Sequence, residues 1–116
     1  TRCACPNHPE KQKDHYNNVT NLGGMLVLVL KTDPRQRQNR ENFFAMGAYA
    51  QNLMLLLHEQ GIGTCWKTPP YIFEPKVRKV FGVHGDEVIA GFLYLTDLEE
   101  VPPKAPRKNK HLISKY

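Results

Sequence analysis

Two glycines one residue apart, Gly61 and Gly63, end the most hydrophobic segment of the chain. A thiol, the only tryptophan and a lysine follow them in the stretch HEQGIGTCWKT, which covers residues 58–68. Gly61 is a natural end for a helix, because glycine adopts the left-handed backbone conformation at little cost. The chain thus places Cys65, Trp66 and Lys67 directly at a helix exit, and this stretch is the first candidate for a functional site.

Four residues near the N-terminus have side chains that bind metals: Cys3, Cys5, His8 and His15. Zinc sites use such thiolate and imidazole ligands, but the spacing C-x-C-x-x-H does not match the common structural pattern. Surface thiols and solvated histidines explain these residues better, so we predict no metal site. With Cys65 the chain has three cysteines, an odd and sparse count that argues against a disulfide-stapled secreted domain.

The composition suits one packed domain with a basic character. Of the 116 residues, 41% are apolar and 23% are charged, and the formal net charge is +5. A net positive charge suggests an anionic ligand or partner. The basic residues are scattered over loops and tail, however, without interleaved aromatic residues that could stack on bases. A small nucleic-acid-binding protein is therefore a disfavoured alternative.

The sequence shows no sign of a membrane segment or of a common nucleotide or hydrolase motif. No apolar run reaches the ~18 residues of a membrane span, no signal peptide is visible, and P-loop, GxGxxG, HExxH and GxSxG motifs do not occur. We expect a cytoplasmic protein with no membrane partner. The first residue is Thr1 rather than Met, which suggests a processed or truncated chain.

Turn signals and apolar runs predict a single domain with an irregular start, a core and an extended basic tail, at residues 1–24, 25–96 and 97–116. The irregular start has room for one short helical turn near 10–16. In the core we expect a strand at 25–31, a long helix at about 40–60, an extended segment after Gly63, a short helix at 74–81 and a strand at 86–96. The first strand is apolar throughout, so it should be buried on both faces at the centre of its sheet. This order of elements predicts an α/β or α+β fold.

The long helix has apolar residues on nearly all sides. One row recurs at spacings of 3 and 4 residues and consists of Phe43, Met46, Ala50, Leu53 and Leu57. The other side of the helix carries Phe44, Ala48 and Leu55. Such a helix needs neighbours on several sides, which can include a second subunit. Gly47 makes one stretch thin, so that another backbone can come close.

From about residue 39 to residue 116 the sequence resembles the C-terminal part of the nitroreductase family of FMN-dependent oxidoreductases. The stretches that carry the resemblance are ENFFAMGAYAQNLMLLLHEQGIGTCWKT, PKVRKVFGVHGDEVIAGFLYLT and PPKAPRK, which agree in order and spacing. The resemblance implies a nitroreductase-like α+β fold, in which a central sheet is packed by a long buried helix. It also implies a homodimer with that helix at its core.

The resemblance implies an FMN site at the glycine exit. In the family, the segment after the glycines lies along the isoalloxazine ring, and it matches Gly63, Trp66, Lys67 and Thr68 here. Glycine lets the main chain approach a flat ring, backbone N–H groups can bond its O4 and N5 edge, and a cation stabilises negative charge on reduced flavin. The alternatives are a core or rim aromatic at Trp66 and a solvated lysine at Lys67.

The same resemblance implies how the rest of FMN is held. The family's tail cations bind the FMN phosphate and match Lys104 and Arg107; arginine suits phosphate because it bonds in a bidentate way. His8 lies in ACPNH, residues 4–8, which is similar to a family segment whose histidine contacts FMN from the partner subunit. The family's N-terminal Arg-Arg-Ser type motif has no counterpart here, so we expect a shortened or incomplete version of the fold.

The activity that the resemblance implies is an FMN-dependent oxidoreductase of the nitroreductase type. Hydride would pass from NAD(P)H to flavin N5 and then to a small-molecule acceptor such as a nitroaromatic or a quinone, with no catalytic acid or base required of the protein. The alternative is a flavin-free, degenerate member of the family that acts as a dimerisation or binding module.

Overall fold

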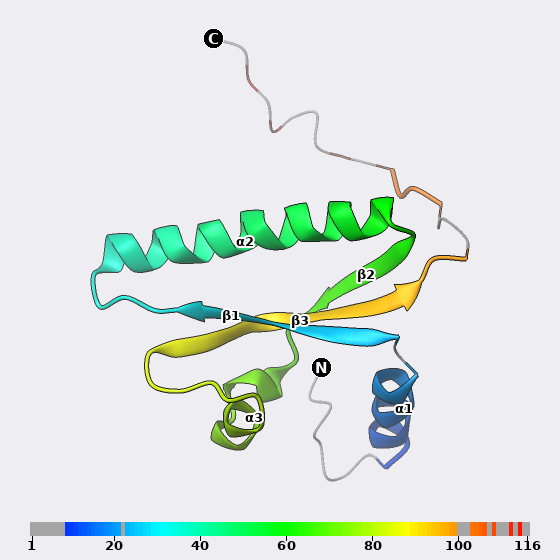
Figure 1. The fold of residues 1–116 in the computed structure, drawn as a ribbon, viewed down its shortest axis with the longest axis horizontal. Coiled ribbons are helices and arrows are strands. Elements are labelled where there is room, and N and C mark those ends of the chain that lie inside the picture. The colour runs from blue at the N-terminus through cyan, green and yellow to red at the C-terminus, as the bar shows by residue number, and fades with distance from the viewer. Residues whose placement is uncertain are drawn as a thin grey trace.

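The structure is a computed structural model that describes residues 9–21, 23–99, 103–106, 108, 112 and 114. It has an α+β fold with one three-stranded antiparallel sheet and helices on both sides (Figure 1). The strand order is β1-β3-β2, so β3 is the middle strand. The elements in chain order are α1 Pro9–Thr20, β1 Gly24–Lys31, α2 Gln36–Glu59, β2 Ile62–Lys67, the 3-10 helix η1 Pro70–Phe73, α3 Pro75–Val80 and β3 Glu87–Asp97.

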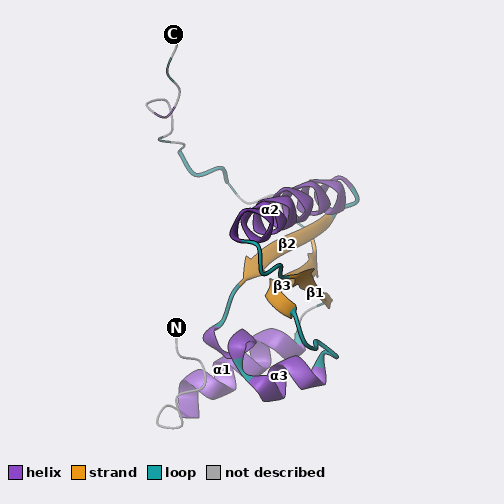
Figure 2. Ribbon diagram, turned by 90° about the vertical axis from the view of Figure 1, so that its left-hand side faces the viewer, coloured by secondary structure: helices purple, strands orange, loops and turns teal. Residues whose placement is uncertain are grey.

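Two apolar layers form on the two faces of the sheet. α2 runs along one face, while α1 and α3 lie on the other side (Figure 2). β3 contributes to both layers because side chains alternate between the faces of a strand. Phe92 packs with Ile72 of η1 on one face, whereas its neighbour Leu93 packs with Ala50 of α2 on the other. These two β3 side chains are 1% and 0% exposed, so the middle strand is the centre of the core.

Most of the predicted core elements are present, with shifted boundaries. The long helix begins at Gln36 rather than near residue 40, and it ends at Glu59. Gly61 then turns the chain with a φ of +76°, which confirms it as a left-handed helix end. The short helix and the last strand are also confirmed, as α3 and β3, and Val80 at the end of α3 is 79% exposed.

Two predictions about the first 31 residues were wrong. In the segment 1–24, expected to be irregular apart from one short helical turn near 10–16, residues 9–20 form the twelve-residue helix α1. Its polar sequence has no apolar pattern that would predict a helix of this length. The strand expected at the centre of the sheet, β1, lies at an edge of the described sheet, because only β3 pairs with it. Its apolar run reflects contacts on both faces rather than a strand on each side, and Leu26 and Val29 are 37% and 36% exposed.

The long helix is buried along one face only. Ala50 is its one buried residue, and Met46, Leu53 and Met54 pack around it against the sheet. Several large apolar side chains elsewhere on the helix are exposed: Phe43 by 45%, Phe44 by 70%, Tyr49 by 59%, Leu55 by 58% and Leu56 by 61%. The single chain thus covers one side of the helix only, and cover by a second subunit stays a prediction. No described helix is long and apolar enough to cross a membrane.

Candidate functional site

The stretch singled out in the sequence forms the strand β2. After the turn at Gly61, β2 pairs antiparallel with β3, from Ile62 opposite Asp97 to Lys67 opposite Phe92. Its other edge pairs with no strand among the described residues, so the strand runs along the rim of the sheet. The ladder stops at Lys67, and the next residues lead into η1. The backbone and side chains at the end of β2 are therefore available to bind another molecule.

Gly63 lies at the beginning of β2 and is buried. Its backbone has no positive φ, so the strand conformation itself does not require glycine. A Cβ added there would lie 3.2 Å from both the Leu98 Cδ1 and the Thr96 Cγ2 atoms. A side chain at this position would therefore need these two methyl groups to shift by a few tenths of an ångström.

Trp66 lies against the sheet on the α2 side. Its indole is partly buried beside Leu93, and its Nε1–H donates to the carbonyl oxygen of Ala90 at 3.3 Å. This arrangement supports the alternative that Trp66 is a rim aromatic of the core. The partner residue that sequence reasoning missed is Gly91, over which the indole lies so closely that no Cβ would fit.

Lys67 and Thr68 are exposed at the end of β2. Side chains alternate along a strand, so Lys67 lies on the face opposite the Trp66 indole. The ion pairs among the described residues involve Lys31, Arg35 and Arg37, and Lys67 takes part in none of them. Lys67, which has no acidic partner in the described part of the chain, is therefore available to an anionic group at the end of this edge strand.

The other predicted FMN contacts are not gathered beside Lys67. The chain leaves the sheet after Asp97, opposite Ile62, and the segment 103–106 that contains Lys104 extends away from the sheet (Figure 1). In the chain, the tail with Lys104 therefore follows the end of β3 that pairs with Ile62, not the end beside Lys67. His8 and Arg107 lie outside the described residues, as do Cys3 and Cys5 of the metal hypothesis. Among the residues that are described, no three side chains form a group suited to a metal.

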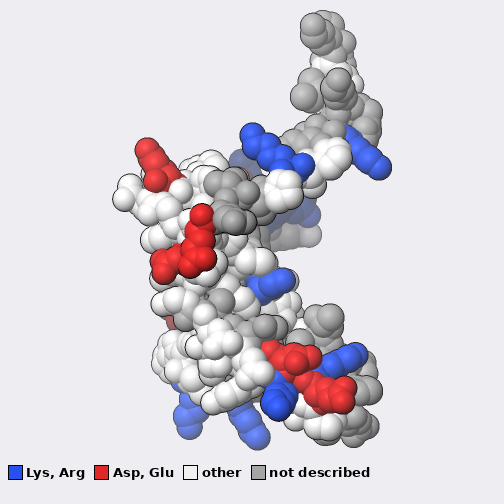
Figure 3. Space-filling model, turned by 90° about the vertical axis from the view of Figure 1, so that its right-hand side faces the viewer, with Lys and Arg blue, Asp and Glu red and all other residues white. Residues whose placement is uncertain are grey.

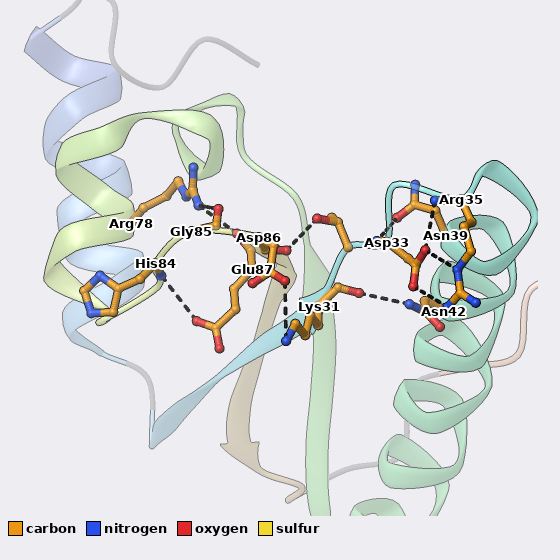
Figure 4. A network of polar contacts seen from close by, with 11 residues as sticks. Lys31, Asp33, Arg35, Asn39, Asn42, Arg78, His84, Gly85, Asp86 and Glu87 are labelled. Atoms are coloured by element: carbon orange, nitrogen blue, oxygen red, sulfur yellow. Dashed lines mark hydrogen bonds and ion pairs between the residues drawn. The ribbon is translucent and has the colours of Figure 1, made fainter.

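A network of polar residues, which the sequence analysis did not single out, lies where β3 begins, around Asp86 (Figure 4). Thr32 donates from both its backbone N–H and its hydroxyl to the carbonyl of Asp86, and Lys31 pairs with the Asp86 carboxylate at 3.4 Å. At the start of α2, Asn42 donates to the carbonyl of Lys31 at 3.1 Å. These bonds tie the end of β1 to the turn before β3 and to α2.

Two arginines complete this polar network. The Arg35 guanidinium bonds both carboxylate oxygens of Asp33, at 2.9 and 2.8 Å, and this bonding lowers the pKa of Asp33 to about 2. Arg78 of α3 donates from Nη2 to the carbonyls of Gly85 and Glu87, at 3.3 and 2.7 Å. Arg35 and the Nη2 group of Arg78 thus hold turns through partners in the chain, whereas Nε of Arg78 is buried without a hydrogen-bond partner among the described residues.

The surface hollow beside α3 is separate from the end of β2. It encloses about 300 Å³ and is lined by Pro75, Arg78, Lys79, Val83, His84 and Gly85. No residue of β2 lines it. On the face drawn in Figure 3, acidic and basic side chains are mixed, and basic ones also lie on the tail. The hollow does not collect the residues predicted to bind FMN.

The donor set at the end of β2 fits part of a flavin. An exposed main chain beyond the ladder and the unpaired cation of Lys67 suit the polar edge of an isoalloxazine ring. A phosphate needs cations or N–H groups around it, and the described residues place no such group beside Lys67. These residues would face the ring, and the contacts to the phosphate would come from outside this strand end.

Comparison with known proteins gives a consistent set of relatives. A family model described as the nitroreductase family matches residues 4–95. The putative NAD(P)H nitroreductase YfhC of Bacillus subtilis (strain 168) is 29% identical over 104 residues, which are 87% of this chain and 54% of that protein. The family-model match begins in the ACPNH stretch and ends before the tail, so Lys104 and Arg107 lie outside that match.

Solved structures share the fold. A nitroreductase-like family protein from Bacillus cereus superposes with a TM-score of 0.81 and 24% identity, over 94% of this chain and 59% of that one. A mutant of the FMN and NADPH-dependent nitroreductase NfnB from sphigopyxis sp. strain HMH gives a TM-score of 0.64 with 20% identity, over 97% of this chain and 51% of that one. The chain thus spans a little over half the length of the relatives it matches.

Proposed function

Because the chain belongs to the nitroreductase family, we propose that it carries part of the site of an FMN-dependent oxidoreductase. NAD(P)H would be the reductant, and a nitroaromatic, a quinone or a similar small molecule would accept the electrons. The family match confirms the resemblance drawn from the sequence, and the nitroreductase-like neighbours confirm the predicted α+β class. The observation that carries the proposal is the exposed Lys67 at the end of β2, which forms no ion pair among the described residues.

The residues at the end of β2 would have distinct roles toward the flavin. When bound, FMN supplies the redox chemistry by accepting hydride and passing electrons on. The main chain at Lys67 and Thr68 would bond the polar edge of the ring, and the Lys67 ammonium would stabilise negative charge there. Lys104, Arg107 and His8 would reach FMN bound mainly by a second copy of the chain, since Lys104 is not beside Lys67 in its own chain.

A homodimer would provide that second copy. From Asn42 to Leu57, α2 has no charged residue, and its exposed surface carries the aromatic and leucine side chains described above. A large exposed apolar surface of this kind marks an interaction site. A twofold contact through α2 would cover it and would bring the tail of one subunit toward the other.

The test is flavin retention by the purified protein. Protein refolded or purified with FMN should show the bound-flavin absorbance at about 450 nm, and NAD(P)H should bleach it. In Lys67→Ala the flavin should stay bound, but its reduction should slow and its potential should fall, because a neighbouring positive charge is gone. Arg37→Ala, an exposed helix cation distant in sequence from β2, is the matched control.

The competing proposal is a flavin-free family member that acts as a dimerisation or binding module. The same apolar face of α2 supports it, because that face needs a partner whether or not flavin binds. A dimer without any retained FMN, at FMN concentrations well above those that saturate flavoenzymes, would favour the module over the enzyme.

A further inference from the structure

The middle strand β3 has an irregularity directly beside Trp66. Along β1, Gly91 lies opposite Leu28, but the next β1 residue, Val29, lies opposite Ile89. Ala90 is therefore the extra residue of a β-bulge, which leaves its carbonyl group outside the regular ladder. The Trp66 Nε1–H donates to this carbonyl at 3.3 Å. The bulge thus supplies an acceptor for the only indole of the chain.

Gly91 allows the indole to reach that acceptor. Its φ of +150° is a conformation that other residues rarely adopt. A Cβ there would overlap the Trp66 ring, at 2.7 Å from Cδ1, and would also lie 2.9 Å from the carbonyl oxygen of Lys67. Trp66 is paired with Leu93, so Gly91 is its diagonal neighbour on β3, within reach of an aromatic side chain. The glycine therefore serves both the indole and the main chain of the next residue.

We propose that Trp66, Ala90 and Gly91 form a lock that fixes the end of β2 and so positions Lys67 and Thr68 for a flavin. The lock lies where the β2 ladder ends, with Lys67 opposite Phe92 as its last pair. Without it, the final residue of an edge strand would be held by its ladder on one side only. The inference rests on the proposed function, because it assigns positioning residues to that same site.

Trp66→Phe tests the lock with little change in packing. It keeps an aromatic ring over Gly91 but removes the hydrogen-bond donor to Ala90. In the ligand-free protein, amide hydrogen exchange at Lys67, the last residue of the ladder, should become at least about tenfold faster, because the strand end opens more often. Ile72→Val, which trims a buried side chain of the opposite layer, should leave exchange at Lys67 unchanged even if it lowers the melting temperature as much as Trp66→Phe does. Unchanged exchange in Trp66→Phe would overturn the lock, whatever the flavin results are.

The flavin potential then shows whether the lock acts through Lys67. Trp66→Phe should shift the FMN midpoint potential in the same negative direction as Lys67→Ala. The double variant should shift it no further than Lys67→Ala alone, since one residue acts through the other. Additive shifts would overturn the positioning role, because Trp66 would then act independently. If the unaltered protein binds no FMN, the proposed function fails, while the exchange result still decides whether the lock exists.

Gly91→Ala is the stronger perturbation of the same lock. The added methyl group should displace the indole, so the emission of the only tryptophan should move to longer wavelength as Trp66 becomes more exposed. Exchange at Lys67 should accelerate as well. A folded Gly91→Ala protein with unchanged emission and exchange would contradict the close approach on which the lock depends.

Discussion

The charged side chains around Asp86 have partners among the described residues, apart from the buried Nε of Arg78, whereas Lys67 at the end of β2 is exposed and forms no ion pair there. In the network, Lys31 pairs with Asp86, Arg35 pairs with Asp33, and Arg78 bonds two carbonyl groups. Lys67 has no ion pair among the described residues. Charged groups whose partners lie in their own chain hold turns, whereas a cation without such a partner is available to a ligand.

The two faces of α2 show the same contrast in apolar form. Ala50 is fully buried against the sheet, while Phe44 on another side of the helix is 70% exposed. The sheet accounts for the first residue, and nothing in the described chain accounts for the second. The regions left unsatisfied by the chain, the outer face of α2 and the end of β2, are those for which we propose a partner and a ligand.

The largest expected effect is on assembly. Leu55→Glu would place a charge on the exposed face of α2, where the Leu55 side chain is 58% exposed in the single chain. A dimer through α2 would have to bury that charge, so its dissociation constant should rise at least about 100-fold, or ~2.7 kcal/mol. Analytical ultracentrifugation of both proteins measures this change.

A control for this variant lies on α3. Val80 is 79% exposed and belongs to a different surface, so Val80→Glu should leave the dissociation constant unchanged. A monomeric unaltered protein at micromolar concentration would contradict the dimer. Equal weakening by Leu55→Glu and Val80→Glu would show that α2 is not the contact.

The next largest expected effect is on stability, in the polar network around Asp86. Arg78→Ala removes the donor for the carbonyls of Gly85 and Glu87, and this change should lower the free energy of unfolding by about 1–3 kcal/mol. Lys79→Ala removes a neighbouring exposed cation and should change it by less than about 0.5 kcal/mol. Urea unfolding gives both values. An Arg78→Ala protein as stable as Lys79→Ala would place this arginine with the unsatisfied residues.

The elements with local signals were predictable from sequence, and those set by distant contacts were not. Apolar periodicity and Gly61 defined the long helix, and the apolar run at 86–96 defined β3. The position of β1 at an edge depends on which strand pairs with it, and no local pattern encodes that pairing. α1 has a strongly polar sequence with the Asn17–Asn18 pair inside it, so turn propensity outweighed the weak helix signal.

The candidate site divides along the same line. The glycine exit and Lys67 were found because they are unusual in sequence, as a glycine pair followed by a lone tryptophan and a cation. The dependence of Trp66 on Gly91 joins residues 25 positions apart (91 − 66) and could be seen only in the folded chain. The sequence explained Gly63 by a contact with the flavin ring. The structure adds a second explanation, because Thr96 and Leu98 limit the space around Gly63.

A smaller effect separates these two explanations of Gly63. Gly63→Val should cost about 1–3 kcal/mol by overpacking against Leu98 and Thr96, and we expect it to abolish flavin retention. Adding Leu98→Ala makes room and should recover part of the stability. If Gly63 also faces the ring, flavin retention should stay lost in the double variant. Recovery of both would show that Gly63 acts only through packing.

The smallest expected effect is a pH dependence from Asp33. The Arg35 side chain, and then the Arg35 backbone N–H, bond the Asp33 carboxylate and lower its pKa from 3.8 to about 2. A carboxyl group with a lowered pKa in the folded state stabilises that state above its unfolded pKa. This contribution is therefore complete above about pH 4 and is lost as the pH falls toward 2. The pair is open to solvent, so the contribution is small and salt screens it.

Asp33→Asn should be slightly less stable than the unaltered protein at pH 7, and the difference should shrink between pH 4 and pH 2. Urea unfolding at several pH values and at low salt measures it, with Asp14→Asn on the exposed helix α1 as the control. A difference between Asp33→Asn and the unaltered protein that stays constant from pH 7 to pH 2 would mean that the carboxylate charge contributes nothing, and that the Asp33 bonds to Arg35 act only through their geometry.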